Sequence, residues 1–588
     1  MTEVDVPLAV TQSDSITHID TRKLQTWSWI ALIAIATVRA WFTRYEFDGD
    51  SISYLDIARA IADGHPDLAI HAYWAPGYPV LFSLFLRLFH PSTWWECPLA
   101  HLLNVLIFTS ALASFQLFWS EARLWHENHA RRNGAAIPIP AFWALGYSIF
   151  GIATLSVIPV SRVGPDLLWA VFCCLAGWSV LRFRRSPSIV VALLLGLFLA
   201  LGYYAKAPFF PIGFLFIFCA SFAWPLSRRT ILLAGTALVT FLLLCAPYIT
   251  AISISKRHFT FGESARLSQA FYINGVQYYV HWQGGPAGSG TPVHPTRKLN
   301  DFPEIYEFAA KDMGTYPPWF DPTYWYQGLT PHLNWNLQAK IFAANMIREF
   351  QMIMDSGPQL ICAVIILGLL ASYREQWTKG IWKLWPMWLP AATALPMFAL
   401  VHVEPRFLGG WLILLFAGAI CACSLPEDSR TLRAVSCVGL AALVIVGATL
   451  VSQASQEALS GNHAAGRSPR SALIANFLLN NGLRQGGRVA IIGDGNEAYW
   501  AHLARLQVVA EIPADIRWYR VHPANDFWES GQDQQRKSLA ILAQTGAEAV
   551  IAEPQGYFTP VAQPSTVPAP WKKIDGTDAY VYFFNAVQ

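Results

Sequence analysis

The sequence predicts a helical membrane protein with about eleven transmembrane helices, large segments outside the membrane and a small C-terminal α/β domain. Hydrophobic residues make up 54% of the 588 residues and charged residues only 13%, which is roughly half the charge of a soluble domain. The apolar residues are gathered in long runs, as in membrane spans. The net charge of +3 is too small to indicate a nucleic acid as a partner.

Eleven apolar runs are long enough to cross a bilayer. They are 27–44, 98–119, 139–158, 166–182, 189–205, 208–225, 230–250, 356–372, 384–401, 407–424 and 434–452. The segment 76–90 is also apolar, but it is short and contains Arg87. At about 1.5 Å per residue it does not reach across a ~30 Å hydrocarbon core. We therefore expect it to form a helix at the membrane interface.

Basic residues indicate which side each loop occupies. If the N-terminal residues 1–26 are cytoplasmic, the inside segments hold 15 Lys and Arg residues, whereas three short outside loops hold one each. This distribution satisfies the positive-inside rule. Within the membrane domain, 27–452, it places outside the loops 45–97 and 251–355. Residues 453–588 also lie outside. The chain has no glycosylation sequon, which favours a bacterial inner membrane and a periplasmic outer face.

The C-terminal tail from about residue 468 alternates helix and strand patterns, which predicts a mostly parallel sheet. Its first strand is followed by Gly493-Asp-Gly495-Asn-Glu-Ala498, which matches the Gly-x-Gly-x-x-Ala pattern of dinucleotide-binding folds. Nicotinamide cofactors are scarce outside the cytoplasm. We interpret the motif as a tight turn and expect no nucleotide cofactor.

Two aspartates, Asp48 and Asp50, follow the first span closely. If a helix begins here, Asp50, Tyr54 and Ala58 share one of its faces. Either aspartate could then simply cap the helix. The short outside turns also carry charges, namely Arg162, Asp166, Lys206, His402, Glu404 and Arg406, and Lys256 and Arg257 follow the seventh span. Acids and bases gathered at one membrane face indicate a site there, although each alone could be an interfacial residue or form a local ion pair.

Here the sequence resembles a known family. Asp50 with Tyr54 and Ala58, followed by Tyr73 and the Pro-Gly-Tyr-Pro of 76–79, resembles the first periplasmic loop of the GT-C superfamily of polyprenyl-phosphate-sugar glycosyltransferases. The bacterial relatives of aminoarabinose transferases and protein mannosyltransferases are most similar. The turns at 165–168, 203–208 and 404–408 also resemble that family, in the same order, so the resemblance covers about 27–425. The family's Asp-Glu pair is Asp50-Ser51 here, with Asp48 upstream, which leaves open which aspartate is the base.

The resemblance implies transfer of a sugar from a polyprenyl phosphate to an acceptor at the periplasmic face, with inversion. A carboxylate base suits a weakly nucleophilic alcohol, and cations suit the departing phosphate. The candidate catalytic residues are Asp50, Asp48 and Asp166. The candidate phosphate ligands are Lys206, Arg257 and Arg406. The candidate sugar or acceptor contacts are Tyr54, Tyr73, His402, Glu404, Trp319 and Trp325.

The expected partners are a polyprenyl-phosphate sugar, membrane lipids and an acceptor that is a glycan, a lipid or a protein. The histidines are too scattered to predict a metal site. A divalent metal as a cofactor stays an open alternative. Two other functions fit the pattern less well. They are a polysaccharide polymerase or ligase, and a non-catalytic lipid or glycan transporter, although transporters place charges near the middle of the membrane and often show repeats.

Overall fold

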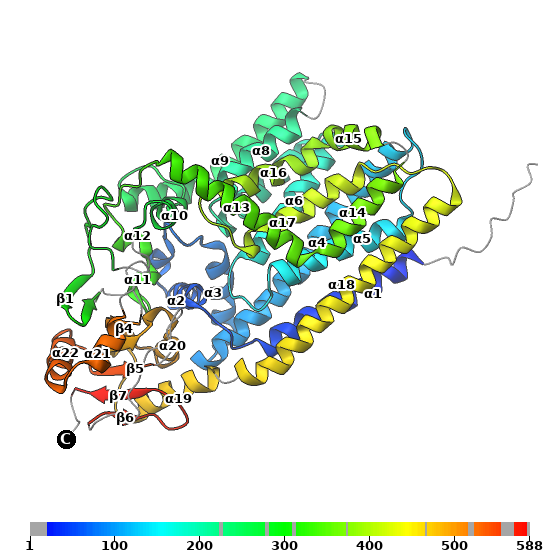
Figure 1. Cartoon of the computed structure of the whole chain (residues 1–588). Coiled ribbons are helices and arrows are strands. Elements are labelled where there is room, and N and C mark those ends of the chain that lie inside the picture. The colour runs from blue at the N-terminus through cyan, green and yellow to red at the C-terminus, as the bar shows by residue number, and fades with distance from the viewer. Residues whose placement is uncertain are drawn as a thin grey trace, which may run out of the picture.

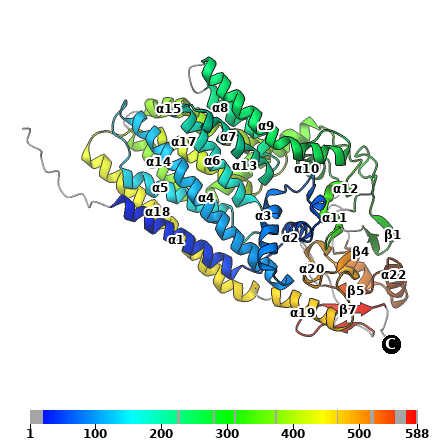
Figure 2. The same cartoon turned by 180° about the vertical axis from the view of Figure 1, so that it is seen from behind.

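The computed structural model describes residues 20–222, 227–276, 281–308, 313–371, 374–464, 467–514, 522–553 and 570–584. Most of the predicted cytoplasmic N-terminus, residues 1–19, lies outside this description. Long helices run side by side in a bundle, and a mixed sheet with short helices lies at one end of it (Figure 1). The short helices that follow the first span lie between the bundle and the sheet, as the view from behind also shows (Figure 2).

A helix is present at each of the eleven predicted spans. They are α1 Thr21–Phe42, α4 Thr93–Ala130, α5 Ile139–Gly151 with the π-helical η2 Ile152–Val157, α6 Asp166–Arg185, α7 Ile189–Ala205, α8 Phe209–Phe222, α9 Arg228–Lys256, α14 Pro358–Leu370, α16 Trp385–Ala399, α17 Pro405–Cys421 and α18 Ser429–Ala464. Two further helices in the same region are α13 Trp335–Ser356 and α15 Arg374–Lys383.

Five of these helices are long and apolar enough to cross a membrane within the described part of the chain: α4, α5 with η2, α6, α9 and α18. A sixth crossing is counted if α13 and α14, which meet at a 90° bend, form one broken span. The helices α7, α8 and α17 are apolar but shorter. The chain is therefore a multi-pass helical membrane protein, while the count of eleven crossings stays a prediction.

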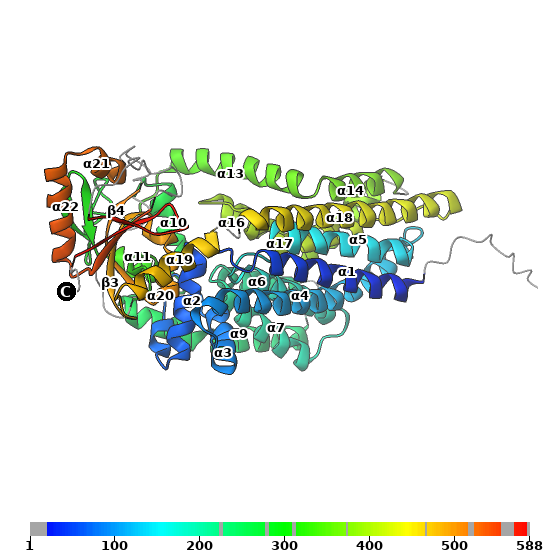
Figure 3. The ribbon, with the colours of Figure 1, turned by 90° about the horizontal axis from the view of Figure 1, so that it is seen from below.

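Small residues allow the helices of the bundle to approach closely. A Cβ atom added at Gly196 of α7 would lie 2.5 Å from the Ala237 carbonyl of α9, and one at Gly409 of α17 would lie 2.4 Å from the Ala153 carbonyl of η2. Such contacts bring the backbones of neighbouring helices together. The resulting van der Waals packing favours helix association in a membrane, where the hydrophobic effect does not drive it. The long α18 lies beside α1 (Figure 3), and Arg39 of α1 pairs with Glu457 of α18.

The segment 76–90 forms its own helix, α3 Gly77–Phe89, about 20 Å long at 1.5 Å per residue. It packs against α2 Gly49–Ala62. Tyr78 and Phe82 are buried on one side, whereas Leu84 and Leu88 are exposed on the other. One side of α3 thus packs against protein, and its other side presents apolar residues of the kind that contact lipid.

The sidedness of the long loops gives the first testable prediction. A reporter that works only in the cytoplasm, fused after residue 300, should be silent, because an interfacial α3 leaves residues 251–355 outside. Fusion after residue 185, in a predicted inside loop, should give signal and serves as the control. A bright reporter at residue 300 would mean that α3 crosses the membrane.

The seven-stranded sheet has the order β1-β2-β4-β3-β5-β7-β6. The strands are β1 Arg297–Asp301, β2 Glu304–Glu307, β3 Arg488–Gly493, β4 Gln507–Pro513, β5 Ala549–Ala552, β6 Lys572–Lys573 and β7 Tyr580–Phe583. The central strands β4, β3 and β5 are parallel, and the outer pairings are antiparallel. The tail supplies the α/β pattern that its sequence predicts, with α19 Arg467–Asn480, α20 Tyr499–Ala504, α21 Pro523–Glu529 and α22 Gln532–Gln544.

The sheet is not built from the tail alone. The hairpin of β1 and β2 belongs to the loop 251–355, and β2 pairs with β4, with Tyr306 opposite Glu511. The same loop contributes α10 Ser264–Tyr272, α11 Pro317–Phe320 and α12 Pro322–Trp325, and the first loop adds the short η1 Pro66–Ala69. The large loop and the tail therefore form one structural unit rather than two independent ones.

The glycine-rich turn after β3 leads into the single 3₁₀ turn η3 Gly495–Glu497 and then the short α20. A Cβ atom at Gly495 would lie 2.5 Å from the ring of Tyr316 and 2.7 Å from the carboxylate of Glu511. The glycine thus permits close packing of the 313–321 segment. This packing supports the interpretation of the motif as a structural turn.

Candidate active site

The first charged residues of the site belong to the start of α2. Asp48 is the N-cap of this helix, and its Oδ1 accepts hydrogen bonds from the Ser51 backbone N–H at 2.8 Å and the Ser51 hydroxyl at 2.6 Å. The N-cap function, which the sequence assigned to either aspartate, therefore belongs to Asp48. Asp50 lies in the first turn of the helix and is free of this function.

Asp50 is held by three hydrogen-bond donors from distant parts of the chain. Its Oδ2 accepts from Arg162 Nη2 at 2.9 Å and from Arg406 Nη2 at 3.1 Å, and its Oδ1 accepts from the Trp319 indole at 3.0 Å. Burial favours the neutral carboxyl, but Arg406 and Arg162 outweigh it and place the pKa of Asp50 below its ordinary value. The carboxylate is therefore ionised and fixed in orientation.

Asp48 differs from Asp50 in its electrostatics. It contacts the same guanidinium, with Arg162 Nη2 at 2.7 Å from Asp48 Oδ2. Burial is the largest influence and raises the pKa of Asp48, although Arg162 opposes it; the nearby charge of Asp50 adds to the rise. The two aspartates thus share one arginine, but their pKa values shift in opposite directions.

The turn before α8 and the start of α6 supply a second ion pair. Lys206, which follows α7, pairs with Asp166 at the start of α6, and Arg406 Nη1 lies 3.6 Å from the other oxygen of Asp166. The Lys206 ammonium lies over the rings of Phe407 at 4.4 Å and Trp169 at 5.0 Å. Burial lowers the pKa of Lys206, while Asp166 opposes this effect. Arg406 therefore links Asp166 to Asp50.

Glu404 and His402 form the outer edge of this cluster. Glu404 accepts from Arg406 Nε at 2.5 Å and lies 3.1 Å from His402 Nε2. The His402 ring stacks on Tyr272 of α10, with 4.1 Å between ring centroids and 2° between planes. Burial favours the neutral acid, but His402 and Arg406 hold the pKa of Glu404 far below its ordinary value. The turn between α16 and α17 therefore contacts α10 of the large loop.

Aromatic side chains line the same place. Tyr54 of α2 packs edge-on against Trp74 at 5.0 Å, and Tyr73 packs against Trp74 at 4.6 Å and against Trp319 at 5.5 Å. Burial raises the pKa of both tyrosines well above the ordinary value, so both hydroxyls stay protonated. Apolar ring faces and polar ring edges of this kind suit contacts with a sugar.

Two of the sequence-predicted site residues do not join the cluster through any contact in the described residues. Arg257 is the left-handed C-cap of α9 and is exposed. Trp325 is buried, and its indole donates to the Pro317 carbonyl at 2.9 Å within the loop. Next to Arg257, Lys256 lies 3.5 Å from Asp321, which follows α11.

The sequence did not single out Arg162 as a site residue, yet it contacts both aspartates at the start of α2. The sequence does contain a feature that could have identified it: Arg162 is the one basic residue of a short turn that is predicted to lie outside the membrane. The cluster as a whole holds three cations, Arg162, Lys206 and Arg406, against four acids, Asp48, Asp50, Asp166 and Glu404. An arriving phosphate would therefore compete with carboxylates for these cations.

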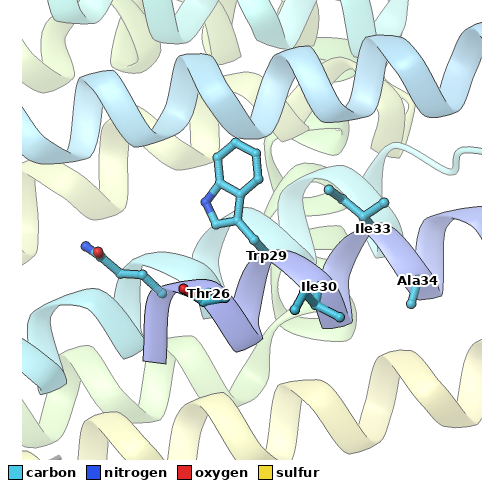
Figure 4. A pocket seen from close by; sticks show the side chains of 6 residues that line it. Thr26, Trp29, Ile30, Ile33 and Ala34 are labelled. Carbon is cyan, nitrogen blue, oxygen red and sulfur yellow. The ribbon is translucent and has the colours of Figure 1, made fainter. Parts of the chain in front are cut away.

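A metal site is not evident: within the described residues no three His, Cys, Asp or Glu side chains are placed to hold an ion. A hollow lies elsewhere, on the first half of α1 (Figure 4), with a volume of about 610 Å³. It is lined by Gln25, Thr26, Trp29, Ile30, Ile33 and Ala34. All six belong to one helix of the membrane bundle, so we interpret this hollow as a lipid-facing furrow.

No protein-family model and no curated protein matches the chain. Among solved structures, ArnT from Cupriavidus metallidurans bound to undecaprenyl phosphate matches with a TM-score of 0.50 and 13% identity, over 89% of this chain and 93% of ArnT. The apo structure of the same protein gives a TM-score of 0.48 and 13% identity, over 90% and 93%. The chain has the fold of ArnT, in agreement with the resemblance that its motifs indicate.

Proposed function

We propose that this protein is a membrane glycosyltransferase that moves a sugar from a polyprenyl-phosphate donor to a periplasmic acceptor. The observation that carries the proposal is the convergence of Asp50, Asp166, Lys206 and Arg406 from four separate segments at the outer end of the bundle. An ionised carboxylate beside several cations suits the attack of an alcohol and the departure of a phosphate. The fold it shares with ArnT, one structure of which holds undecaprenyl phosphate, supports the lipid-linked donor.

In the proposed reaction, Asp50 takes the proton from the acceptor hydroxyl as its oxygen bonds to the anomeric carbon. The bond between that carbon and the phosphate oxygen breaks, and the electron pair stays with the polyprenyl phosphate. Lys206 and Arg406 stabilise the charge that develops there. A single displacement of this kind inverts the anomeric configuration. The low pKa of Asp50 keeps it ready to accept a proton, at the expense of its strength as a base.

Lys206 is the best candidate for the first contact with phosphate. Its ammonium has three donors, and among the described residues only Asp166 accepts a hydrogen bond from it. By contrast, Arg406 is shared among Glu404, Asp50 and Asp166. A phosphate can therefore reach Lys206 without first displacing several carboxylates, and we assign Arg406 to holding the site together as well as to the leaving group.

The test is an assay in purified membranes or proteoliposomes with radiolabelled polyprenyl-phosphate sugars and total envelope extract as the acceptor source. Transfer of label to a product that is no longer the donor lipid, with release of polyprenyl phosphate, would support the proposal. Membranes carrying Asp50→Asn at equal abundance are the control. Growth of a long glycan chain would indicate a polymerase instead, and movement of intact labelled lipid between leaflets would indicate a transporter.

A further inference from the structure

A second buried polar cluster joins the first loop to the C-terminal part of the chain. It contains His502 of α20, Asp56 and Arg59 of α2, Glu96 of α4 and Thr315 of the large loop. Side chains of His502 and Glu96 are only 5% and 1% exposed. None of these residues belongs to the acid and base cluster around Asp50. Buried polar networks of this kind are costly unless every member is paired, so their arrangement is strongly fixed.

His502 lies between two carboxylates. Its Nδ1 is 2.7 Å from Asp56 Oδ1, and its Nε2 is 3.1 Å from Glu96 Oε2. Each ring nitrogen must donate a hydrogen, so the ring is an imidazolium. Burial alone would lower the pKa of His502, but the contacts with Asp56 and Glu96 raise it to about 9. With Arg59 also paired to Glu96, two cations balance two anions.

Asp56 also contacts the large loop. Its Oδ2 accepts the Thr315 backbone N–H at 2.6 Å, and its Oδ1 accepts the Thr315 hydroxyl at 3.0 Å. On its other side the loop is bound to β4, since the Val508 N–H donates to the Thr315 carbonyl at 2.9 Å. The 313–321 segment is therefore held between α2 and the C-terminal sheet.

Four residues after Thr315, the same segment reaches the acid of the candidate active site. The Trp319 indole donates to Asp50 Oδ1 at 3.0 Å. The Trp319 carbonyl accepts from the Ser53 hydroxyl and from the Trp74 indole, both at 3.1 Å. The 313–321 segment therefore contacts the His502 cluster through Thr315 and contacts Asp50 through Trp319, whose indole helps to orient the carboxylate.

We propose that His502 is a positioning residue, through which the C-terminal part of the chain holds the 313–321 segment and so keeps Trp319 on Asp50. The order of contacts is His502 to Asp56, Asp56 to Thr315, and Trp319 to Asp50. The kinetic part of this proposal rests on the proposed transferase function, whereas the structural part does not. It assigns the C-terminal domain a part in organising the site, beyond any part in binding the acceptor.

Hydrogen exchange of the intact protein in detergent or nanodiscs tests the structural part. His502→Gln should raise the exchange rate of the Thr315 amide by about tenfold or more, because the imidazolium that orients Asp56 is lost. The matched control is Glu553→Gln, which removes a buried acid of the same domain that pairs with Arg470 and accepts from Trp500 at 2.7 Å. It should leave exchange in 313–321 unchanged.

The pH dependence provides an independent readout. The groups that face His502 are Asp56 and Arg59 on α2, Glu96 on α4 and the stacked ring of Tyr499 on its own helix. Because the pKa of His502 is about 9 and its ordinary value is 6.5, the cluster is complete below pH 6.5 and is lost as the pH rises through about 9. Protection of 313–321, corrected for intrinsic exchange, should fall there in the wild type and not in His502→Gln.

Kinetics test the link to the acid. His502→Gln should lower kcat by about tenfold with little change in the KM for the lipid donor, and Trp319→Phe should lower kcat similarly while 313–321 stays protected. If His502→Gln does not fold, Thr315→Val removes only the hydroxyl contact and should raise exchange less. Unchanged exchange in His502→Gln overturns the positioning proposal. A wild type without transfer activity overturns the proposed function, and the exchange results still decide the positioning.

Discussion

Replacement of Asp50 by asparagine is expected to lower the transfer rate by about 10² or more while the protein stays at normal abundance in the membrane. The amide has the size of the carboxylate but lacks its basicity and charge. Folding should survive because Asp48, not Asp50, caps α2. Arg162 would still pair with Asp48, and Arg406 with Glu404 and Asp166. The measurement is the transfer rate per mole of membrane-inserted protein.

Asp48 provides the matched control for this variant. Asp48→Asn keeps an oxygen that can accept from Ser51, so the cap is largely retained, and a small loss of rate is expected through the altered contact with Arg162. Asp48→Ala removes the cap and should cost about 1 kcal/mol of stability, seen as lower abundance rather than lower specific rate. A normal specific rate in Asp50→Asn, or a larger loss in Asp48→Asn, would transfer the base function to Asp48.

The pH profile should distinguish the two aspartates in the wild type. The pKa of Asp50 lies below its ordinary 3.8, whereas the pKa of Asp48 lies above it. On acidification the pair should take up its first proton at Asp48, and Asp50 should lose its charge only at still lower pH. If Asp50 is the base, the acid limb of the rate profile should therefore stay at the same low pH in Asp48→Asn, because Asp48 is already neutral when Asp50 titrates.

Much of the membrane architecture follows from local sequence properties. Apolar run length depends only on neighbours in the chain, so a helix is found at each predicted span and α3 is a separate short helix. The tail strands β3, β4 and β5 were equally predictable, because buried parallel strands leave continuous apolar runs. The charged outside turns also identified Lys206, Arg406 and Asp166, which the structure brings together.

What the sequence could not predict depends on contacts between distant segments. The hairpin β1–β2 has strands of five and four residues with mixed exposure, so its pairing with β4 leaves no clear pattern in the chain. The sequence predicts Trp319 only as a candidate sugar or acceptor contact, and it is the fold that places its indole on Asp50. His502 lies in a short helix of the tail, 446 residues from its partner Asp56. A contact between residues so far apart in the chain leaves no periodic pattern in the local sequence.

Removal of the Lys206 ammonium is expected to weaken use of the lipid donor more than use of the acceptor. Lys206→Met should lower the affinity for polyprenyl phosphate by about tenfold or more, since a charge-assisted hydrogen bond to phosphate is lost. The variant also leaves Asp166, whose side chain is 5% exposed, with Arg406 alone at 3.6 Å. Loss of activity by itself would therefore not separate a phosphate ligand from a structural partner of a buried acid.

The double variant Lys206→Met with Asp166→Asn separates the two functions, because it removes both members of the ion pair and leaves no uncompensated charge. Asp166→Asn alone should bind polyprenyl phosphate at least as tightly as the wild type, since the carboxylate that competes for Lys206 is gone. The double variant should fold normally and still bind weakly if Lys206 contacts the phosphate. Restored binding in the double variant would mean that Lys206 only neutralises Asp166, and the phosphate site would then be centred on Arg406 and Arg162. Binding is measured by displacement of a labelled polyprenyl phosphate from purified protein, which requires no knowledge of the sugar or the acceptor.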